Sequence, residues 1–289
     1  MINGKRVVAW IPYGRHRTVE ILLSYLQRDH DRGLVDELWL YMNTRRGEEG
    51  TVDREWARRI ATRRDWVKQV RRPDDVRIYR KIQMNTMYAY RFMVDEDTIF
   101  IRFDDDIVYV HEDAIEALVL DASSGPQLCS FPIIINNAVV SHHLQQHGII
   151  PLQEPDWPEV GNHCMDPIGW TDGQFAVQLH ELLLSHIDAG TVDELFMHTS
   201  LPLRPQQFSV SCFAARGSEY AKINGVLDTE EEKWHTVVRP RELGEDNTLV
   251  PNALVSHLTF LTQWRHFAPG APGGHILDEY RKRAMQHGA

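Results

Sequence analysis

Hydrophobic positions in the first 120 residues alternate between short continuous runs and stretches with helical spacing. Continuous runs of this length are typical of buried strands, whereas apolar residues three and four positions apart predict amphipathic helices. The predicted strands cover residues 6–12, 36–43, 76–80 and 98–103. The predicted helices cover residues 18–33, 53–70, 85–94 and 112–120. This alternation predicts an α/β domain with a mainly parallel central sheet and helices on both faces.

The second half of the chain shows a less regular pattern. It begins with a strand, turn and helix over 130–144, followed by a long loop, 153–173, that is rich in Pro, Gly, Trp and His. A helix over 174–187 and a strand over 208–215 come next. No linker rich in Ser, Gly or Pro divides the sequence, so we expect one domain over residues 1–289.

Composition places the chain among soluble globular proteins. Of its 289 residues, 43% are hydrophobic and 25% are charged, which suits a large buried core. The sequence has neither about eighteen consecutive apolar residues nor a secretion signal, so we expect a cytoplasmic protein without a membrane segment. Cys129, Cys164 and Cys212 stand far apart, and this spacing argues against a disulfide framework or a structural zinc site.

The net charge of −10 conceals a basic segment. Between Met42 and Ile82 the sequence has thirteen basic residues against seven acidic ones, a balance of +6 that leaves −16 for the rest. Such a segment is typical of a solvated helix face with intrahelical ion pairs, and also of a patch that binds a polyanion. The arginines that would form a nucleic-acid patch are Arg54, Arg58, Arg59, Arg63, Arg64, Arg71 and Arg72.

Three consecutive carboxylates, Asp104, Asp105 and Asp106, follow the predicted strand 98–103. Ionised aspartates repel one another, so solvent or a cation must neutralise the cluster. Hard oxygen ligands suit Mg²⁺ or Mn²⁺, and the alternation of a strand lets Asp104 and Asp106 face one side while Asp105 points away. The alternative is a solvent-exposed acidic turn that caps the next helix. Ligands of open α/β sheets bind at the carboxyl ends of strands, which is where this cluster falls.

Four stretches, in one order along the chain, carry a resemblance to a known family. They are IPYGR after the first strand, TIFIRFDDDIVYVHEDAIEALV at mid-chain, IIINNAVVSH after it, and EEEKWHTVVRPRELGEDN with NALVSHLTFLTQ near the end. Together they resemble the GT-A superfamily of nucleotide-diphospho-sugar transferases. The resemblance implies a single Rossmann-like domain with a nucleotide-sugar-binding half, residues 1–110, and an acceptor-binding half, residues 111–289. It also implies a hexosyl- or pentosyltransferase that depends on Mn²⁺ or Mg²⁺ and takes a nucleotide sugar, with UDP as the commonest carrier.

Residue roles for the donor follow from this resemblance. The loop that would hold the nucleobase and ribose contains Pro12, Tyr13, Gly14 and Arg15. Asp106 would bind the metal directly, Asp104 would face the ribose or the metal, and His257 would complete the metal site. Further candidates for contact with the nucleotide sugar are Lys81, Asn85 and Asp105.

The acidic block DTEEEKW, residues 228–234, supplies the candidate catalytic base. An inverting transferase needs a carboxylate that deprotonates the acceptor hydroxyl. The block resembles the acidic segment before the acceptor helix of the superfamily, and we expect Glu231 to be the base, with Glu230 and Glu232 as alternatives. The block is also typical of an ordinary solvated helix start. It resembles the acidic site of exostosin-like enzymes as well, which retain configuration, so the stereochemistry stays open.

The acceptor is a hydroxyl compound whose class the sequence leaves open. Trp157, His163 and Trp170 in the long loop are candidate walls of an acceptor site, and aromatic walls suit a saccharide as well as an extruded base. A hydroxymethylated base in phage-type DNA would use the basic segment for phosphate contacts. A glycan, protein or small-molecule acceptor is the alternative. Two other classes remain, a nucleotidyltransferase and a non-catalytic protein that binds nucleotide sugars or nucleic acid.

Overall fold

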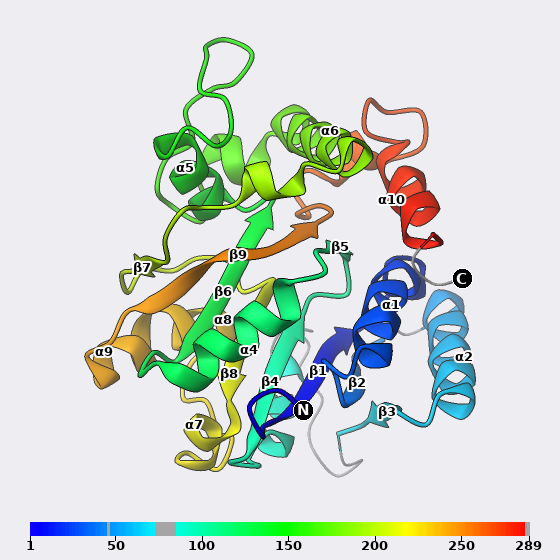
Figure 1. Ribbon diagram of the computed structural model, residues 1–289. Helices are drawn as coiled ribbons and strands as arrows, with labels where there is room; N and C mark the ends of the chain where they lie inside the picture. The colour runs from blue at the N-terminus through cyan, green and yellow to red at the C-terminus, as the bar shows by residue number, and fades with distance from the viewer. Residues whose placement is uncertain (45–46, 73–84, 287–289) are drawn as a thin grey trace.

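A nine-stranded sheet runs through the described residues, 1–44, 47–72 and 85–286, of this computed structural model (Figure 1). The strands are β1 (Arg6–Tyr13), β2 (Glu37–Met42), β3 (Val67–Val70), β4 (Thr98–Phe103), β5 (Ile107–Val110), β6 (Cys129–Ile135), β7 (Leu201–Leu203), β8 (Cys212–Arg216) and β9 (Asn247–His257). The α-helices are α1 (His16–Asp31), α2 (Glu48–Arg63), α4 (Ala114–Ser124), α5 (Ala138–Gln146), α6 (Gly173–Ala189), α7 (Gly217–Ala221), α8 (Glu231–Lys233), α9 (Arg239–Leu243) and α10 (Ile276–Ala284). The shorter helical turns are η1 (Met87–Phe92), η2 (Pro167–Thr171), η3 (Val192–Leu195), η4 (Trp234–Val238) and η5 (Trp264–Phe267).

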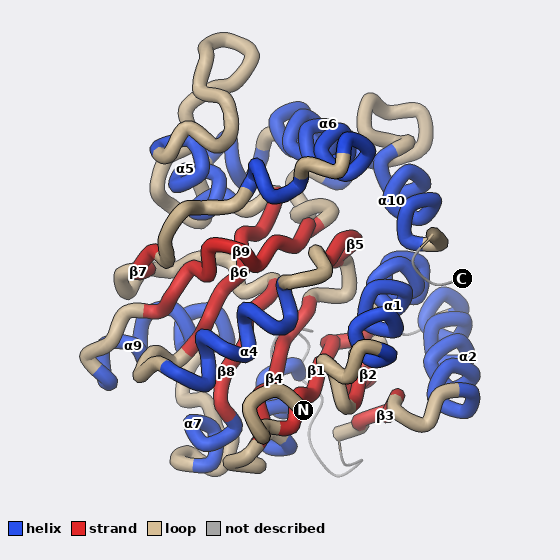
Figure 2. Tube along the Cα trace, viewed as in Figure 1, coloured by secondary structure: helices blue, strands red, loops and turns tan. Residues whose placement is uncertain are grey.

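The strand order is β3-β2-β1-β4-β8-β6-β9-β5, with β7 paired to β9. Parallel pairing joins β3, β2, β1 and β4. Because β8 is antiparallel to both β4 and β6, and β9 is parallel to β6, six strands share one direction and β5, β7 and β8 oppose it. The predicted mainly parallel sheet is confirmed, and Figure 2 shows its strands between the surrounding helices.

Helical elements cover both faces of this sheet. Trp10, Arg102 and Phe213 stand side by side on neighbouring strands. The ring of Tyr90 in η1 packs against Trp10 with centroids 5.3 Å apart, and the ring of His235 in η4 packs against Phe213 at 4.7 Å. On the other face, α4 lies across β6, β8 and β9 (Figure 1). Every residue of β4 and β6 is buried, which agrees with a continuous apolar run covered on both sides.

Two predicted elements of the first half were wrong in type or extent. The helix expected over 53–70 ends at Arg63 in the structure, and Val67 begins strand β3, where it pairs with Leu38 of β2. The expected helix over 85–94 is shorter, the 3₁₀ turn η1. The sequence did not predict β5, and the predicted strand over 76–80 lies outside the described residues.

The remaining predicted elements are present with small shifts of their ends. Strands β1, β2, β4 and β6 and helices α1, α4, α5 and α6 lie where the periodicity placed them. The strand predicted over 208–215 is shorter at its start, since β8 begins at Cys212. No helix among the described residues is long and apolar enough to span a membrane.

Candidate functional site

The three aspartates lie at the edge of the sheet where several strands end. Asp104 follows the last residue of β4, and His257 is the last residue of β9. Arg15 follows β1, whose strand direction is the same as that of β4 and β9. The backbone amide of Leu258 donates to the carbonyl of Asp106 at 2.9 Å, which ties the end of β9 to the aspartate cluster. Residues far apart in sequence therefore meet at the carboxyl ends of the strands, as the topology predicts.

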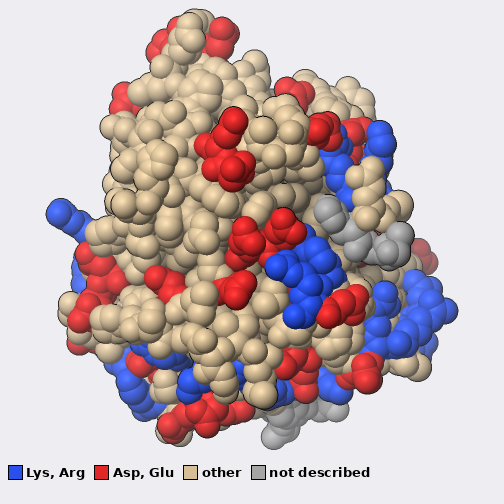
Figure 3. All heavy atoms as spheres, viewed as in Figure 1, with Lys and Arg blue, Asp and Glu red and all other residues tan. Residues whose placement is uncertain are grey.

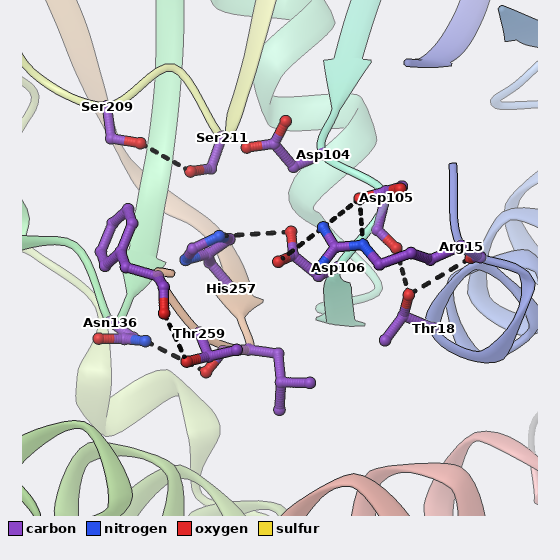
Figure 4. A network of polar contacts seen from close by, with 12 residues as sticks. Arg15, Thr18, Asp104, Asp105, Asp106, Asn136, Ser209, Ser211, His257 and Thr259 are labelled. Atoms are coloured by element: carbon purple, nitrogen blue, oxygen red, sulfur yellow. Dashed lines mark hydrogen bonds and ion pairs between the residues drawn. The ribbon is translucent and has the colours of Figure 1, made fainter. Parts of the chain in front are cut away.

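Asp104, Asp106 and His257 form a group that fits a divalent metal ion (Figure 4). Each offers one ligand atom, and these atoms lie within 4.8 Å of one another. His257 Nε2 is 3.3 Å from Asp106 Oδ1, while its buried Nδ1 has no hydrogen-bond partner in the described part of the chain. Two carboxylates and one imidazole are donors that Mn²⁺ accepts. The predicted pairing of Asp104 with Asp106 is therefore present in the geometry, and the ion itself is a matter for experiment.

Asp105 turns away from this group and binds the loop after β1. Its Oδ1 accepts hydrogen bonds from the guanidinium of Arg15, one of them from Nε at 2.9 Å, and its Oδ2 accepts the backbone N–H of Gly14 at 3.0 Å. A Cβ on Gly14 would lie 3.1 Å from that same oxygen, so the close approach favours glycine. The side chain of Thr18 donates to the carbonyl of Asp105. Asp105 thus fixes the β1 loop against the metal group.

The pKa values of the three aspartates are shifted in different directions. Burial raises the pKa of Asp105 to about 6, against the lowering effect of Arg15. Burial likewise raises the pKa of Asp104, against the lowering effect of Arg102. Asp106 is different: burial acts to raise its pKa, but His257 and Arg15, whose NH2 lies 3.0 Å from Oδ2, outweigh burial and hold it low. Asp106 is therefore the carboxylate most firmly held in its charged form.

A buried arginine that the sequence reading missed connects this cluster to the acidic block. The guanidinium of Arg102 in β4 donates to Asp104 Oδ1 at 2.9 Å and to Glu231 Oε1 at 2.6 Å, and a third bond reaches the carbonyl of Val210. Only 5% of Arg102 is exposed. A lone arginine inside the buried run TIFIRF was a usable signal, because a buried guanidinium requires carboxylate partners.

The acidic block places its three glutamates in three different environments. Glu231, the expected base, is bound by Arg102 and by the hydroxyl of Tyr90. Glu230 is exposed. Glu232 lines a cavity beside Asp104, and burial raises its pKa to about 7 despite the hydrogen bond that it accepts from Gln207 at 2.8 Å. A general base works best with a pKa near the working pH, and Glu232 is the glutamate of this block that combines such a pKa with a place in the cavity lining.

This cavity has a volume of about 290 Å³, and both titratable and apolar side chains line it. Its lining residues are Asp104, Cys164, Met165, Trp170, Gln207, Ser209, Glu232, His257 and Phe260. Of the predicted acceptor residues, only Trp170 lines it. Trp157 instead packs edge-on against Phe175, with ring centroids 5.9 Å apart, and His163 Nδ1 accepts the backbone N–H of Met165. The loop therefore contributes Cys164, Met165 and Trp170 rather than the predicted trio.

The predicted nucleotide loop is brought only partly to the site. Tyr13 is fully buried, stacks on Trp56 and donates its hydroxyl to the carbonyl of Asp53 at 2.7 Å, so its ring is not available to a nucleobase. Pro12 belongs to the end of β1 and is half-buried. Asn85 Oδ1 accepts a bond from Arg72. Lys81 lies outside the described residues.

A buried amide pair holds the segment after His257 in place. Gln263 is fully buried, and its Oε1 accepts the Nδ2 hydrogen of Asn136 at 3.0 Å and the backbone N–H of Phe260 at 3.1 Å. Its Nε2 approaches the carbonyl of Gly169 at 3.4 Å, and Asn136 also donates to the carbonyl of Leu258 (Figure 4). One side chain thus connects the ends of β6 and β9 to the loop that carries Trp170.

The basic segment forms an exposed face on α2 and the adjoining strand. Arg54, Arg58, Arg59 and Arg63 lie exposed on α2, and basic atoms gather at the right of the surface view, where α2 lies (Figure 3). The other predicted members bind neighbours: Arg64 donates to Gln27, Arg71 to Gln69 and Arg72 to Asn85. The arginines do not line the cavity that contains Asp104 and Glu232.

Comparison with known proteins supports the fold and leaves the chemistry to be tested. No protein-family model and no curated protein matches the sequence. A crystal structure of GalNAc-T7 with UDP, GalNAc and Mn²⁺ matches with a TM-score of 0.53 at 14% identity, covering 96% of this chain and 49% of GalNAc-T7. This chain therefore spans about half the length of that protein.

Two further solved structures show weaker likeness. A mycobacterial protein matches with a TM-score of 0.47 at 16% identity over 98% of this chain and 75% of its own. A 4-diphosphocytidyl-2C-methyl-D-erythritol synthase from Anaerococcus prevotii matches at 0.33 and 16% identity over 46% of this chain and 57% of its own. These two are too weak to define a fold.

The structure has the fold of the GT-A glycosyltransferases, and the predicted fold class is confirmed. Asp104 and Asp106 lie close together after β4, at the strand end where the Asp-x-Asp pair was expected. The division into a donor half and an acceptor half stays a prediction.

Proposed function

We propose that this protein is a metal-dependent glycosyltransferase that moves a sugar from a nucleotide diphosphate, most simply a UDP-sugar, to an acceptor hydroxyl. The observation that supports it is the convergence of Asp104, Asp106 and His257 within 4.8 Å at the carboxyl edge of a GT-A sheet. A bound Mn²⁺ or Mg²⁺ would neutralise the charge of the leaving diphosphate.

Residues of this chain would bind the ion, contact the phosphates and accept the proton of the acceptor. Asp104, Asp106 and His257 would hold the ion, and Arg15, which remains 45% exposed at its side chain, would offer a guanidinium to phosphate oxygens. Glu232 would accept the proton of the acceptor hydroxyl, because it lines the same cavity as Asp104 and has a raised pKa. Glu231 and Arg102 would hold this arrangement in position.

A screen of nucleotide sugars by thermal shift with and without Mn²⁺ tests the donor. A selective ligand stabilises the folded state by mass action, by about 2.7 kcal/mol at one hundred times its Kd. We expect one nucleotide sugar to raise Tm only when Mn²⁺ is present, and its slow hydrolysis to yield the nucleoside diphosphate. Absence of binding and turnover for every nucleotide sugar would remove the transferase proposal. Turnover of nucleoside triphosphates instead would favour a nucleotidyltransferase, and binding without turnover a non-catalytic protein.

The acceptor proposal has two versions, a hydroxymethylated base in DNA and a glycan, protein or small molecule. The exposed arginines of α2 support the DNA version. A helix rises about 1.5 Å per residue, so Arg63 at the end of α2 lies well along the helix axis from Asp53, whose carbonyl accepts the hydroxyl of Tyr13. DNA bound at Arg63 would therefore lie away from the end of β1. Binding of duplex DNA with hydroxymethylated bases at 50 mM salt is the test. We expect the charge reversals Arg58→Glu, Arg59→Glu and Arg63→Glu to weaken it and flatten its salt dependence. No binding by the wild type would eliminate this version.

A further inference from the structure

The cavity beside the metal group is lined by both polar and apolar side chains. Asp104, Glu232 and His257 are the titratable residues of its lining. Met165, Phe260 and the indole of Trp170 are the large apolar ones. Apolar walls with a few polar groups are typical of small-molecule sites, in which the apolar contacts supply affinity and the polar groups fix orientation.

Exposed apolar side chains lie on the two segments that carry Trp170 and Phe260. The hydroxyl of Thr262 donates to the carbonyl of Trp170, so the segment after Phe260 lies directly beside the loop that carries the indole. On this segment Leu261 is 86% exposed and Trp264 is 52% exposed, and Met165, which lines the cavity, is 57% exposed. Exposed apolar side chains gathered on adjoining segments are typical of a binding surface.

With the donor diphosphate and its ion in place, the described lining of this cavity would offer no basic side chain to a second anionic group. None of the described residues that line it is Lys or Arg, and two are carboxylates, Asp104 and Glu232. Acceptors that carry phosphate depend on contacts with basic side chains, and the arginines of α2 do not reach this lining. A phosphate beside Glu232 would also meet like charge once that group ionises.

We propose that the acceptor is an uncharged amphiphile, a hydroxyl compound such as a glycoside whose alkyl or aryl group lies on Met165, Trp170 and Leu261. Its polar end points to Glu232 and Asp104, and its apolar end passes over Phe260 to the exposed rim. This inference rests on the proposed transferase function and narrows its acceptor. It places such a compound ahead of DNA.

Binding of matched probes to the full chain, measured by calorimetry with Mn²⁺ and UDP present, tests the proposal. The probes are octyl β-glucoside, methyl β-glucoside and octyl sulfate, each below its micelle concentration. We expect the octyl glucoside to bind about tenfold more tightly than the methyl glucoside, the effect of burying roughly two methylene groups. We expect octyl sulfate to bind more weakly than octyl glucoside. Equal binding of the two glucosides, or tighter binding of the sulfate, would overturn the proposal.

Variants of exposed side chains locate the apolar contact without disturbing the core. Leu261→Gln and Met165→Gln should each reduce the octyl preference about threefold or more, since polar substitution removes apolar area. Leu120→Gln is the matched control, because Leu120 is also an exposed leucine, at 40%, and belongs to another element, α4. An octyl preference that survives both Leu261→Gln and Met165→Gln, or that falls equally in the control, would contradict the assigned surface.

The readouts separate this inference from the proposed function. Mn²⁺-dependent binding of UDP by the wild type reports the donor site alone. If UDP binds and the octyl preference is absent, only the acceptor inference fails. If the octyl preference is present and depends on Leu261 while no nucleotide binds, the apolar surface is supported as a ligand site and its assignment to an acceptor is overturned.

Discussion

The molecule contains two triplets of identical acidic residues, Asp104–Asp106 and Glu230–Glu232, which share one feature of their contacts. In each triplet an arginine binds the middle carboxylate: Arg15 binds Asp105, and Arg102 binds Glu231. The carboxylates beside the middle one then serve other ends. Asp104 and Asp106 face the proposed metal, and Glu232 faces the cavity.

The difference between the triplets lies in how much of each is enclosed. All three aspartates contribute to one site, whereas Glu230 is exposed and plays no part in it. Helix α8 has only three residues, Glu231–Lys233, and Glu232 is the one that lines the cavity. The comparison teaches that an acidic run can hold carboxylates with different surroundings at adjacent positions. An arginine partner does not separate them by itself, because Arg15 also contacts Asp106 and Arg102 also contacts Asp104.

The largest expected effect separates the two kinds of aspartate. Asp106→Asn removes a proposed direct ligand and should lower Mn²⁺ affinity by at least about a hundredfold, because loss of a group that merely supports a ligand already costs about 10- to 100-fold. Asp105→Asn removes charge from a residue that binds Arg15 and Gly14 and does not face the proposed ion, and it should cost about tenfold, the lower end of that range. Calorimetric titration with Mn²⁺ measures both. Equal losses in the two variants would erase the distinction within this triplet.

The next effect separates the glutamates in catalysis. Glu232→Gln should lower kcat by about 10²- to 10⁴-fold, the usual contribution of a general base. Glu231→Gln should lower kcat less, because Glu231 is engaged by Arg102 and Tyr90. Turnover of the donor and acceptor identified by the screens is the measurement. If Glu231→Gln lowers kcat more than Glu232→Gln does, in samples with the same folded fraction, Glu231 would again be the preferred candidate for the base, as the sequence predicted.

The pH dependence of the same residue gives a second test. With a pKa of about 7, Glu232 loses its activity as a base when it takes up a proton, so kcat/KM should fall below about pH 7. Because this pKa is raised above its ordinary value of 4.5, the folded state keeps a proton that the unfolded state has lost. Stability should therefore decrease as pH rises from 4.5 toward 7. In Glu232→Gln the fall of kcat/KM should be absent and the stability trend should be smaller, because the raised pKa of Asp105 still contributes to it. A wild-type kcat/KM profile flat through pH 7 would contradict the role.

A stability effect follows for the arginine partner. Glu231→Gln should lower the free energy of unfolding by about 3 kcal/mol, because removal of one partner leaves a buried charge less compensated. Urea unfolding measures this change. A loss below about 0.5 kcal/mol, the range of ordinary surface substitutions, would show that the Arg102 pair contributes little.

The smallest effect is expected at the exposed member of the second triplet. Glu230→Gln should change the free energy of unfolding by no more than about 0.5 kcal/mol, as is usual for an exposed side chain, and should leave kcat unchanged. Urea unfolding and turnover, measured beside Glu232→Gln, check both. A fall in kcat comparable to that of Glu232→Gln would indicate that Glu230, two residues before Glu232, takes part in catalysis.

Much of the fold was readable because its strands are covered on both faces. Buried strands such as β4 and β6 leave unbroken apolar runs in the sequence. Strand β3 was misread because Trp56, Ile60 and Val67 also satisfy helical spacing. What makes Val67 a strand residue is its pairing with Leu38, a contact that no local pattern contains.

The site was predictable to the level of residue type and position on an element. The position of Asp104 and Asp106 could be predicted because strand ends converge in an open α/β sheet. His257 came from the family resemblance alone, and the structure brings it next to the two aspartates. The choice among Glu230, Glu231 and Glu232 needed the orientation of a three-residue helix, α8, which periodicity cannot supply. Tyr13 was misplaced because burial against Trp56 depends on α2, which packs there only in the folded chain.

Arg15 gives the aspartate cluster a counterion that belongs to the chain (Figure 4). A cluster neutralised in this way does not need a metal to assemble, unlike small metal-dependent domains that unfold when the ion is removed. Under the proposed function, folding and metal loading would therefore be separate events. The chain would reach its final shape without manganese, and the proposed activity would begin only once the ion binds.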